Sequence, residues 1–546
     1  MIRRVFRSQT KTVTLAALIL GASALISRLL GLLRDRLLAG TFGAGPELDV
    51  YFAAFRIPDF IYGILIMGGI SAIFLPVFSE YFKKGEEDGW RLASNVLNVF
   101  LVLLILLCSV LAVFTPWLIK LVAPGFNSEQ ASVAVSLTRI IFLSPIFLGL
   151  SSLFSGVLHY FNRFLAYSLA PIVYNLSIIF GILVFVPLFG IHGLAFGVVL
   201  GAFLHWIVQV PAAISSGFRY FPSFNFKSPG LKKVFRLMLP RMVGASVYHI
   251  NLVVVTAIAS TLTVGSIAIF NFANNIQHMP IGIVGASFAL ASFPALSRAW
   301  AQDKKKEFLD GFSSAFRQII FLVVPISVFL FLLRAQVIRL VLGTGEFGWI
   351  ETRLTAASLG VFCLSIFAFA LIPFLLRAFF SLHDTKTPAF ISLAYMIFNT
   401  LFAFLLVRVL SYSNAFQEFF IKALKLQGIS DISVVGLSLA VSLSGLIYFS
   451  LLLFFLRKKL DHIRLKEIRN SFTKIVLSAG FMAVAVYLVL QTSVFFLKTE
   501  TFAGIFFQTF LAGLVAILAF FLFSLVFKSS EAQATKSLIL KKFNKQ

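Results

Sequence analysis

The sequence predicts an all-α polytopic membrane protein with about fourteen transmembrane helices. Of its 546 residues, 59% are hydrophobic and only 12% are charged, and the mean hydropathy is +0.97. Soluble domains are roughly half apolar, so this composition excludes a water-soluble fold. Apolar runs of about twenty residues recur along the chain, and each is long enough to cross a bilayer as a helix. The third observation is an alternation of basic and non-basic connections between these runs.

The apolar runs also indicate how the chain is divided. The predicted spans begin near residues 13, 49, 93, 132, 164, 191, 237, 266, 315, 353, 388, 432, 472 and 503. Residues 218–236 mix aromatics, prolines and a basic cluster, which is typical of an interfacial linker that could hold a short amphipathic helix. We therefore predict an N-terminal lobe of six helices (1–217), a cytoplasmic linker (218–236), a C-terminal lobe of six helices (237–456), and a last helix pair with a basic cytoplasmic tail (457–546).

An internal repeat supports the two lobes. Short segments of the first half recur about 220 residues later in the corresponding span of the second half. The pairs are Gly21-Ala22-Ser23 with Gly244-Ala245-Ser246, Phe74 to Ser79 with Ser292 to Ser297, and Leu143-Ser144 with Leu364-Ser365. Two six-helix repeats in parallel orientation are a transporter architecture, and the substrate path then lies at their interface.

The net charge of +25 reflects membrane topology rather than nucleic-acid binding, because the basic residues lie mainly between the spans. They occupy the N-terminal arm, every second connection and the tail, which predicts that both termini are cytoplasmic. These residues are Arg3, Arg4, Arg7, Lys11, Lys83, Lys84, Arg91, Lys227, Lys232, Lys233, Arg236, Lys304, Lys305, Lys306, Arg457, Lys458, Lys459, Arg464, Lys466, Arg469, Lys528, Lys536, Lys541, Lys542 and Lys545.

The motifs of most enzyme classes are missing from the sequence. Cys108 and Cys363 both lie inside predicted spans, so they indicate neither a disulfide framework nor a zinc site. There is no phosphate-binding loop for ATP and no polar catalytic cluster. We therefore expect a protein that is not an enzyme and that needs no metal or cofactor.

Charged side chains within the first two spans are the first candidates for a functional site. A charge inside a membrane span costs about 3 kcal/mol or more, so it usually faces a cavity or a partner. Arg28 lies midway along the first span, Arg34 and Asp35 lie near its outer end, Asp49 opens the second span, and Arg56 follows within it. Arginine binds diphosphate through two parallel hydrogen bonds and stays charged, so these arginines fit an anionic ligand. Snorkelling of Arg34 and Asp35 to the interface, and helix capping by Asp49, are the alternative interpretations.

The second half offers mainly neutral hydrogen-bonding groups. Asn274, Asn275 and His278 fall in a polar stretch of the eighth span, and Arg241 lies in the seventh. Arg377 in the tenth span is a further candidate. Asn274, Asn275 and His278 are predicted to line a wet cavity wall, with hydrogen bonding between helices as the alternative.

At this point the sequence resembles the MurJ (MviN) family of the superfamily that also holds the MATE exporters and the polysaccharide flippases. The resemblance covers nearly the whole chain and rests on the following segments: Ser27 to Asp35, Leu48 to Phe52, Phe74 to Ser79, Ala123 to Phe126, Pro280 to Ile283, Phe293 to Ser297, Arg377 to Phe380 and Asp384 to Pro388. It implies fourteen helices and a flippase that carries lipid II, an undecaprenyl diphosphate bearing a glycopeptide, by alternating access around a central cationic cavity. Lipid II and the phospholipid bilayer are the implied partners, and cell wall synthesis proteins are further candidates.

The resemblance also assigns roles to residues. It implies that Arg28 and Arg34 bind the diphosphate, while Asp35 and Asp49 orient arginines or form gating pairs, with Arg377 as a further gating or orienting candidate. This chain has Tyr62 where many members have an arginine, and Asn274, Asn275 and His278 where they have a charged cluster. Arg56 and Arg241 are hypothetical replacements for the missing positive charge. The resemblance further implies that the last two helices form a groove for the lipid tail.

Three other functions stay open at the sequence level. A flippase for another polyprenyl-diphosphate glycan, such as an O-antigen unit, is the first, although the helix count and the Asp384 to Pro388 motif argue against it. A MATE-like antiporter is the second, and it is expected to have a cavity acid rather than arginines. A lipid-processing enzyme is the third, and the lack of a polar catalytic cluster argues against it.

Overall fold

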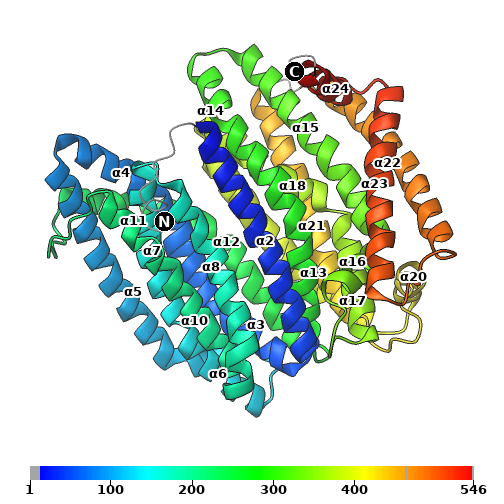
Figure 1. Ribbon diagram of the computed structural model, residues 1–546, viewed down its shortest axis with the longest axis horizontal. Coiled ribbons are helices and arrows are strands. Elements are labelled where there is room, and N and C mark those ends of the chain that lie inside the picture. The colour runs from blue at the N-terminus through cyan, green and yellow to red at the C-terminus, as the bar shows by residue number, and fades with distance from the viewer. Residues whose placement is uncertain (1–12, 461–463, 544–546) are drawn as a thin grey trace. The chain divides into compact units, whose positions relative to one another are not determined.

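The computed structural model describes residues 13–460 and 464–543, and every regular element within them is a helix (Figure 1). Among these residues, 11 helices, or up to 12 if a bent pair counts as one span, are long and apolar enough to cross a membrane. The predicted all-α membrane fold is confirmed, whereas the count of about fourteen is not confirmed and stays a prediction. The basic residues Arg3, Arg4, Arg7, Lys11 and Lys545 lie outside the described residues.

The chain folds into two compact units. Unit 1 comprises Met1–Ala268 with Gly345–Phe347, and unit 2 comprises Ile269–Thr344 with Gly348–Gln546. The predicted linker at 218–236 therefore lies inside unit 1. Helix α12 (Pro229–Ser260) begins within this linker. It packs on the spans Pro46–Lys84 and Glu86–Val122 of unit 1. The division into two six-helix repeats stays a prediction.

Unit 1 is built from long helices that pack side by side. Its first helix, α2, packs on α8, and α10 packs on α7 and α8. The elements are α2 (Val13–Phe42), α3 (Pro46–Ile61), η1 (Tyr62–Ile70), α4 (Ser71–Lys84), α5 (Glu86–Val122), α6 (Ser128–Ile141), α7 (Leu143–Tyr160), α8 (Phe164–Phe180), η2 (Gly181–Phe185), α9 (Val186–Phe189), α10 (His192–Ile207), α11 (Val210–Ser215) and α12.

Unit 2 continues with the same architecture and ends in two helices that pack on each other, α22 and α23. Helix α13 begins at the end of unit 1 and runs on into unit 2. The elements are α13 (Ser266–Pro280), η3 (Ile281–Ala286), α14 (Ser287–Ala301), α15 (Lys305–Leu332), α16 (Arg334–Val341), α17 (Trp349–Cys363), α18 (Ile366–Ser381), α19 (Lys386–Ser411), α20 (Ala415–Leu424), α21 (Ser433–Leu460), α22 (Leu465–Ser493), α23 (Phe502–Val526) and α24 (Ser530–Phe543).

Irregular turns occur at corresponding places in the predicted repeats. The second and eighth spans each contain a π-helical segment, η1 beginning at Tyr62 and η3 beginning at Ile281, about 220 residues apart. The fourth span is interrupted at Phe142, and the tenth bends by 49° between α17 and α18. The break at Phe142 directly precedes Leu143-Ser144 and the bend of the tenth span falls at Leu364-Ser365, whereas Ser128–Tyr160 counts as one span without such a bend.

Residues 218–228 contain no helix and run along α5. The Asn95 side chain holds this segment at both backbone groups of Asn225, accepting from its amide at 2.6 Å and donating to its carbonyl at 3.0 Å. Asn98 donates to the Ser223 carbonyl at 2.9 Å. The basic cluster that follows belongs to the first turns of α12, so within the described residues the linker holds no separate amphipathic helix.

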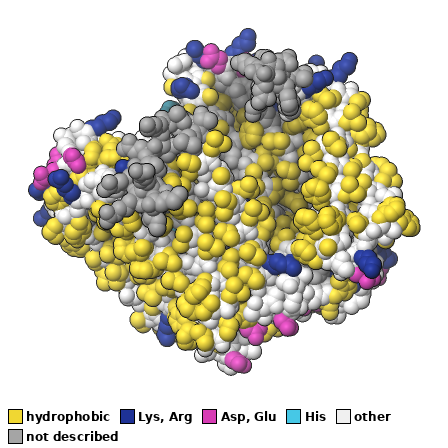
Figure 2. Space-filling view, in the orientation of Figure 1, with side chains coloured by type: hydrophobic (Ala, Val, Ile, Leu, Met, Phe, Trp, Pro, Cys, Tyr) yellow, Lys and Arg dark blue, Asp and Glu magenta, His cyan; other side chains and the backbone are white. Residues whose placement is uncertain are grey.

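The outer faces of the last helices are apolar. Figure 2 shows hydrophobic side chains over the α22 and α23 side of unit 2, with charged side chains gathered at the helix ends. Exposed residues on α23 include Phe507, Ile517 and Leu518. A long exposed apolar face bounded by charged ends fits contact with lipid rather than water.

Candidate functional site

The charged residues at the outer end of α2 are held by a neighbouring acid and by α8. Arg34 donates to Asp35 from Nη2 at 2.8 Å and from Nε at 3.1 Å, and from Nη1 to Asn175 of α8 at 3.3 Å. The Asn175 amide in turn donates to the Ser27 carbonyl at 3.3 Å. Asp35 is buried and Arg34 is partly buried. The pair therefore fixes the guanidinium and joins α2 to α8, instead of extending both side chains into solvent.

Arg28 has a different environment from Arg34. It is partly buried on α2, and among the described residues it makes no hydrogen bond or ion pair. An unpaired guanidinium within a membrane helix is costly unless it faces water or a ligand. Of the predicted arginines in unit 1, Arg28 is thus the one best suited to bind an incoming anion.

Arg56 lies on α3 and is tied to α12. Its Nε donates to the Thr256 hydroxyl at 2.6 Å, and the guanidinium is buried. Asp59 follows one turn later and lines a cavity of 300 Å³ together with Tyr62, Tyr174 and other residues of α3, η1, α7, α8 and α10. A nearby carboxylate and hydroxyl offset the charge of Arg56, so its role in this structure is to connect helices. Arg241, the other hypothetical replacement, is exposed on α12.

Asp49 caps the beginning of α13. Its buried carboxylate accepts from the Gly265 amide at 2.7 Å and from the Ala268 amide at 2.8 Å. The first amides of a helix have no partner within the helix and carry partial positive charge, so a carboxylate there is favourable. The two backbones also approach closely, because a Cβ added at Gly265, whose φ is +90°, would lie 2.0 Å from the Ala44 carbonyl oxygen. Asp49 therefore closes the turn between α12 and α13 onto the start of α3.

The polar residues of α13 lie in unit 2. Asn274, Asn275 and His278 are all partly buried, and Gln277 donates to the Asn274 side chain at 2.9 Å. Asn275 and His278 also have partners. Arg377 on α18 is partly buried, and its Nη1 atom is buried without a hydrogen-bond partner among the described residues. Arg377 thus stays a candidate for an anion-binding group in unit 2.

Sequence reasoning did not identify several residues that complete these contacts. Asn175 and Thr256 are neutral side chains in apolar spans, and their sequence alone gives no sign that they bind arginines. The sequence marks Asp384 only as the first residue of the Asp384 to Pro388 motif. In the structure it accepts from the Thr387 amide at 3.0 Å and pairs with Lys459 of α21 at 2.7 Å. Burial by itself would raise the pKa of Asp384, but these hydrogen bonds and the Lys459 charge hold that pKa below its ordinary value.

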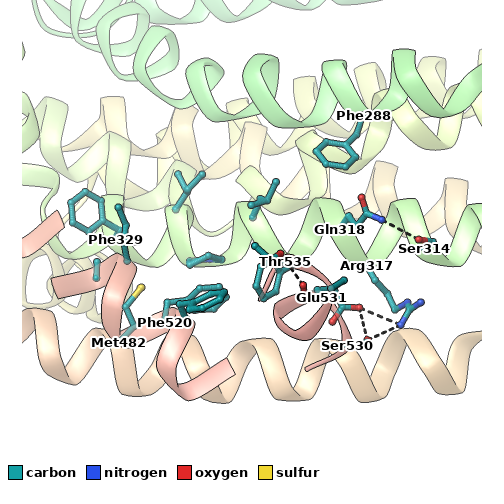
Figure 3. A pocket seen from close by; sticks show the side chains of 18 of the residues that line it. Phe288, Ser314, Arg317, Gln318, Phe329, Met482, Phe520, Ser530, Glu531 and Thr535 are labelled. Carbon is teal, nitrogen blue, oxygen red and sulfur yellow. Dashed lines mark hydrogen bonds and ion pairs between the residues drawn. The ribbon is translucent and has the colours of Figure 1, made fainter. Parts of the chain in front are cut away.

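Unit 2 also contains an elongated groove, which is apolar along most of its length. Its volume is 740 Å³, and its walls come from α14, α15, α22, α23 and α24 (Figure 3). Phe288, Phe329, Met482 and Phe520 line the apolar part, whereas Arg317 and polar groups of α24 lie at one end. A groove of this kind fits a long hydrocarbon chain with an anionic head.

Helical units with long apolar spans, buried charged groups and a mostly apolar groove define a multi-pass membrane protein of the transporter class. A family model described as lipid II flippase MurJ matches residues 38–507. The chain therefore belongs to the MurJ lipid II flippase family.

Individual relatives agree with this assignment. The probable lipid II flippase MurJ of Buchnera aphidicola subsp. Acyrthosiphon pisum is 31% identical over 382 residues, which cover 69% of this chain and 75% of that protein. A solved structure of lipid II flippase MurJ in an inward closed conformation matches with a TM-score of 0.75 and 25% identity, over 93% of this chain and 98% of that one. An inward-facing MATE family multidrug transporter matches with a TM-score of 0.62 and 14% identity, over 80% and 94%. This last likeness concerns the fold alone.

Proposed function

We propose that this protein moves lipid II from the cytoplasmic to the outer leaflet of the bacterial inner membrane for cell wall synthesis. The observation that carries the proposal is membership of the MurJ family over residues 38–507. The substrate is a diphosphate-linked lipid, so it needs a cationic site for its head and an apolar surface for its tail.

In this proposal Arg28 makes the first contact with the diphosphate. It is partly buried and unpaired among the described residues, whereas Arg34 is held in place by Asp35. Arg34 therefore adds fixed positive charge and Asp35 orients it. Polar groups of α13, namely Asn274, Asn275 and His278, supply neutral donors, and Arg377 supplies a guanidinium whose Nη1 atom has no hydrogen-bond partner among the described residues.

The groove of unit 2 holds the lipid tail. Its aromatic and aliphatic walls continue between α15, α22 and α23, and burial of hydrocarbon there replaces contact with surrounding lipid. Alternating access then moves the head between the leaflets by rearranging two lobes around the site. With both termini in the cytoplasm, the polar end of the groove lies at the level of the cytoplasmic headgroups, because α24 follows the last span.

Rescue of a MurJ-depleted bacterium tests this function. Expression of the wild-type chain is expected to restore growth, and an Arg28→Ala, Arg34→Ala double variant at equal membrane abundance is expected to fail. Glu418→Gln, which changes an exposed residue of α20, is the matched control and is expected to rescue fully. Rescue by the double variant would keep the function and discard the arginine site. Failure of a well-expressed wild type would favour another polyprenyl-diphosphate glycan as substrate.

A further inference from the structure

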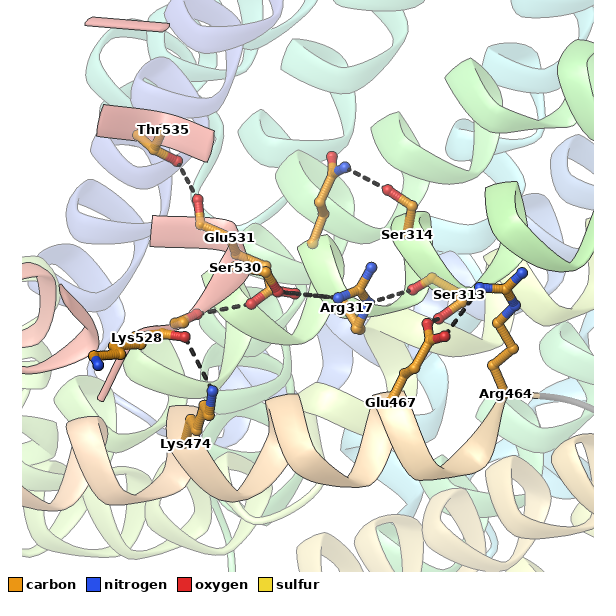
Figure 4. Close-up of polar contacts among 12 residues, drawn as sticks. Ser313, Ser314, Arg317, Arg464, Glu467, Lys474, Lys528, Ser530, Glu531 and Thr535 are labelled. Carbon is orange, nitrogen blue, oxygen red and sulfur yellow. Dashed lines mark hydrogen bonds and ion pairs between the residues drawn. The ribbon is translucent and has the colours of Figure 1, made fainter. Parts of the chain in front are cut away.

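The polar end of the groove is formed by one arginine of α15 and the first turn of α24. Arg317 Nη1 lies 3.2 Å from the Glu531 carboxylate and 3.0 Å from the Ser530 hydroxyl (Figure 4). The side chains are largely withdrawn from solvent, with exposed fractions of 22% for Arg317 and 6% for Glu531. An ion pair in this environment loses hydration, so each partner depends on the other.

Glu531 contacts only one of the two terminal nitrogens of Arg317, Nη1. One carboxylate oxygen faces Nη1, while the other accepts from the Ser529 hydroxyl at 2.7 Å. Arg317 Nε donates to the Ser313 carbonyl at 3.3 Å, and within the described residues Nη2 makes no hydrogen bond. A phosphate group can accept from both terminal nitrogens of a guanidinium at once, which is a stronger arrangement than this single contact.

Further positive charge surrounds this end of the groove. Lys474 of α22 donates to the carbonyl of Lys528 at 3.0 Å, at the junction of α23 and α24 (Figure 4). Arg317, Lys474 and Lys528 lie at this end of the groove with Glu531, and the neighbouring acids Glu467 and Asp310 both pair with Arg464, which leaves one more positive than negative charge in this group. The excess of positive charge favours an anionic group beside Arg317.

Among the described side chains of the helix that carries Glu531, the buried ones lie at its first turn. Ser529, Glu531 and Ala532 are buried, whereas residues 533–537 are exposed. Among these residues, the contacts of Arg317 with Ser530 and Glu531 join α24 to α15. A competitor for Arg317 would therefore weaken the attachment of α24 to α15.

We propose that Arg317 is a binding site for the phosphate of an anionic lipid whose chain lies in the groove, and that α24 covers this site through Glu531 until the phosphate displaces the carboxylate. The inference rests on the proposed function only in taking the groove as a lipid-tail site. The ligand class is a phosphate-headed lipid with a long isoprenoid or acyl chain.

Native mass spectrometry of the full chain in detergent tests this site, with undecaprenyl phosphate and phosphatidylglycerol as probes. Arg317→Gln is expected to weaken binding of the preferred lipid about tenfold, as loss of a charge-assisted hydrogen bond predicts. Glu531→Gln is expected to strengthen it about fivefold, because the competing carboxylate is gone. Glu418→Gln on α20 is the matched control and should bind like the wild type. The ratio of the wild-type affinities for undecaprenyl phosphate and for phosphatidylglycerol identifies which of the two lipids the site prefers.

Three outcomes would overturn the inference. They are equal binding by Arg317→Gln and the wild type, no gain in Glu531→Gln, and equal binding of phosphatidylcholine. Inorganic phosphate at the same concentration is expected not to bind, and binding as strong as that of the lipids would exclude a role for the groove. Arg317→Lys keeps the charge and provides a second variant if Arg317→Gln fails to fold. The assay needs neither glycopeptide nor transport, so failed rescue with intact lipid binding would reject the proposed function and leave this site standing.

Discussion

Arg34 and Asp49 are charged residues of the first two spans, and both are held by hydrogen bonds. Their cost in a membrane span marks Arg34 and Asp49 as residues that need a partner. For Arg34 the main partner is the adjacent Asp35, which the sequence makes visible. For Asp49 the partners are backbone amides of Gly265 and Ala268, and no sequence pattern connects residues so far apart. The sequence therefore predicts that these charged residues need a partner, but it identifies the partner only where that partner is adjacent in the chain.

Asp49→Ala is expected to lower the stability of the protein by about 1–2 kcal/mol, because a helix loses its capping carboxylate. The unfolding midpoint of purified protein in detergent measures this effect. Glu47→Gln is the matched control, since Glu47 lies on the same turn and is exposed. An unchanged midpoint for Asp49→Ala would show that the two amide contacts add no net stability.

At the scale of helices, the Asp384 to Pro388 motif is explained by two contacts. Asp384 accepts from the Thr387 amide, which satisfies the first turn of α19, and its other oxygen pairs with Lys459 at the end of α21. Pro388 falls in the first turn, where its missing amide donor costs no hydrogen bond. The motif thus begins one helix and attaches it to another, a role that concerns structure rather than substrate.

The Asp384 contacts predict a pH dependence of stability. The pKa of this carboxyl is lowered in the folded protein, so its stabilisation is complete above the unfolded pKa of about 3.9 and is lost as the pH falls through the folded pKa. As the pH falls from about 5 to about 2, the unfolding midpoint of Asp384→Asn is expected to fall less than that of the wild type. Glu500→Gln, at an exposed position, should follow the wild type. Parallel curves for Asp384→Asn and the wild type would contradict the assignment.

For the whole molecule, the distribution of Lys and Arg is the strongest signal for membrane orientation. It predicts that residues near Asp303 face the cytoplasm and that residues near Glu500 face outward. The fold agrees with a multi-pass protein, having 11 to 12 candidate spans among the described residues. Orientation is decided by the membrane and the charges at its faces, so it requires a measurement in cells.

Labelling with a membrane-impermeant maleimide checks this orientation. Glu500→Cys is expected to react in intact spheroplasts, and Asp303→Cys only after lysis. The native residues Cys108 and Cys363 are both buried, so the wild-type chain is the control and should stay unlabelled. Labelling of Asp303→Cys in intact spheroplasts would reverse the predicted topology.

The sequence by itself determined the all-α membrane fold, the family and the charged candidates of α2 and α3, because hydropathy, local motifs and buried charge are properties of short segments. The tertiary structure decided which groups meet: Asn175 with Arg34, Thr256 with Arg56, and Glu531 with Arg317. It also decided that α12 packs with the preceding helices in unit 1. These outcomes depend on packing between segments that are far apart in the chain. Asn175, Thr256 and Glu531 bind arginines only because the fold places an arginine beside each of them.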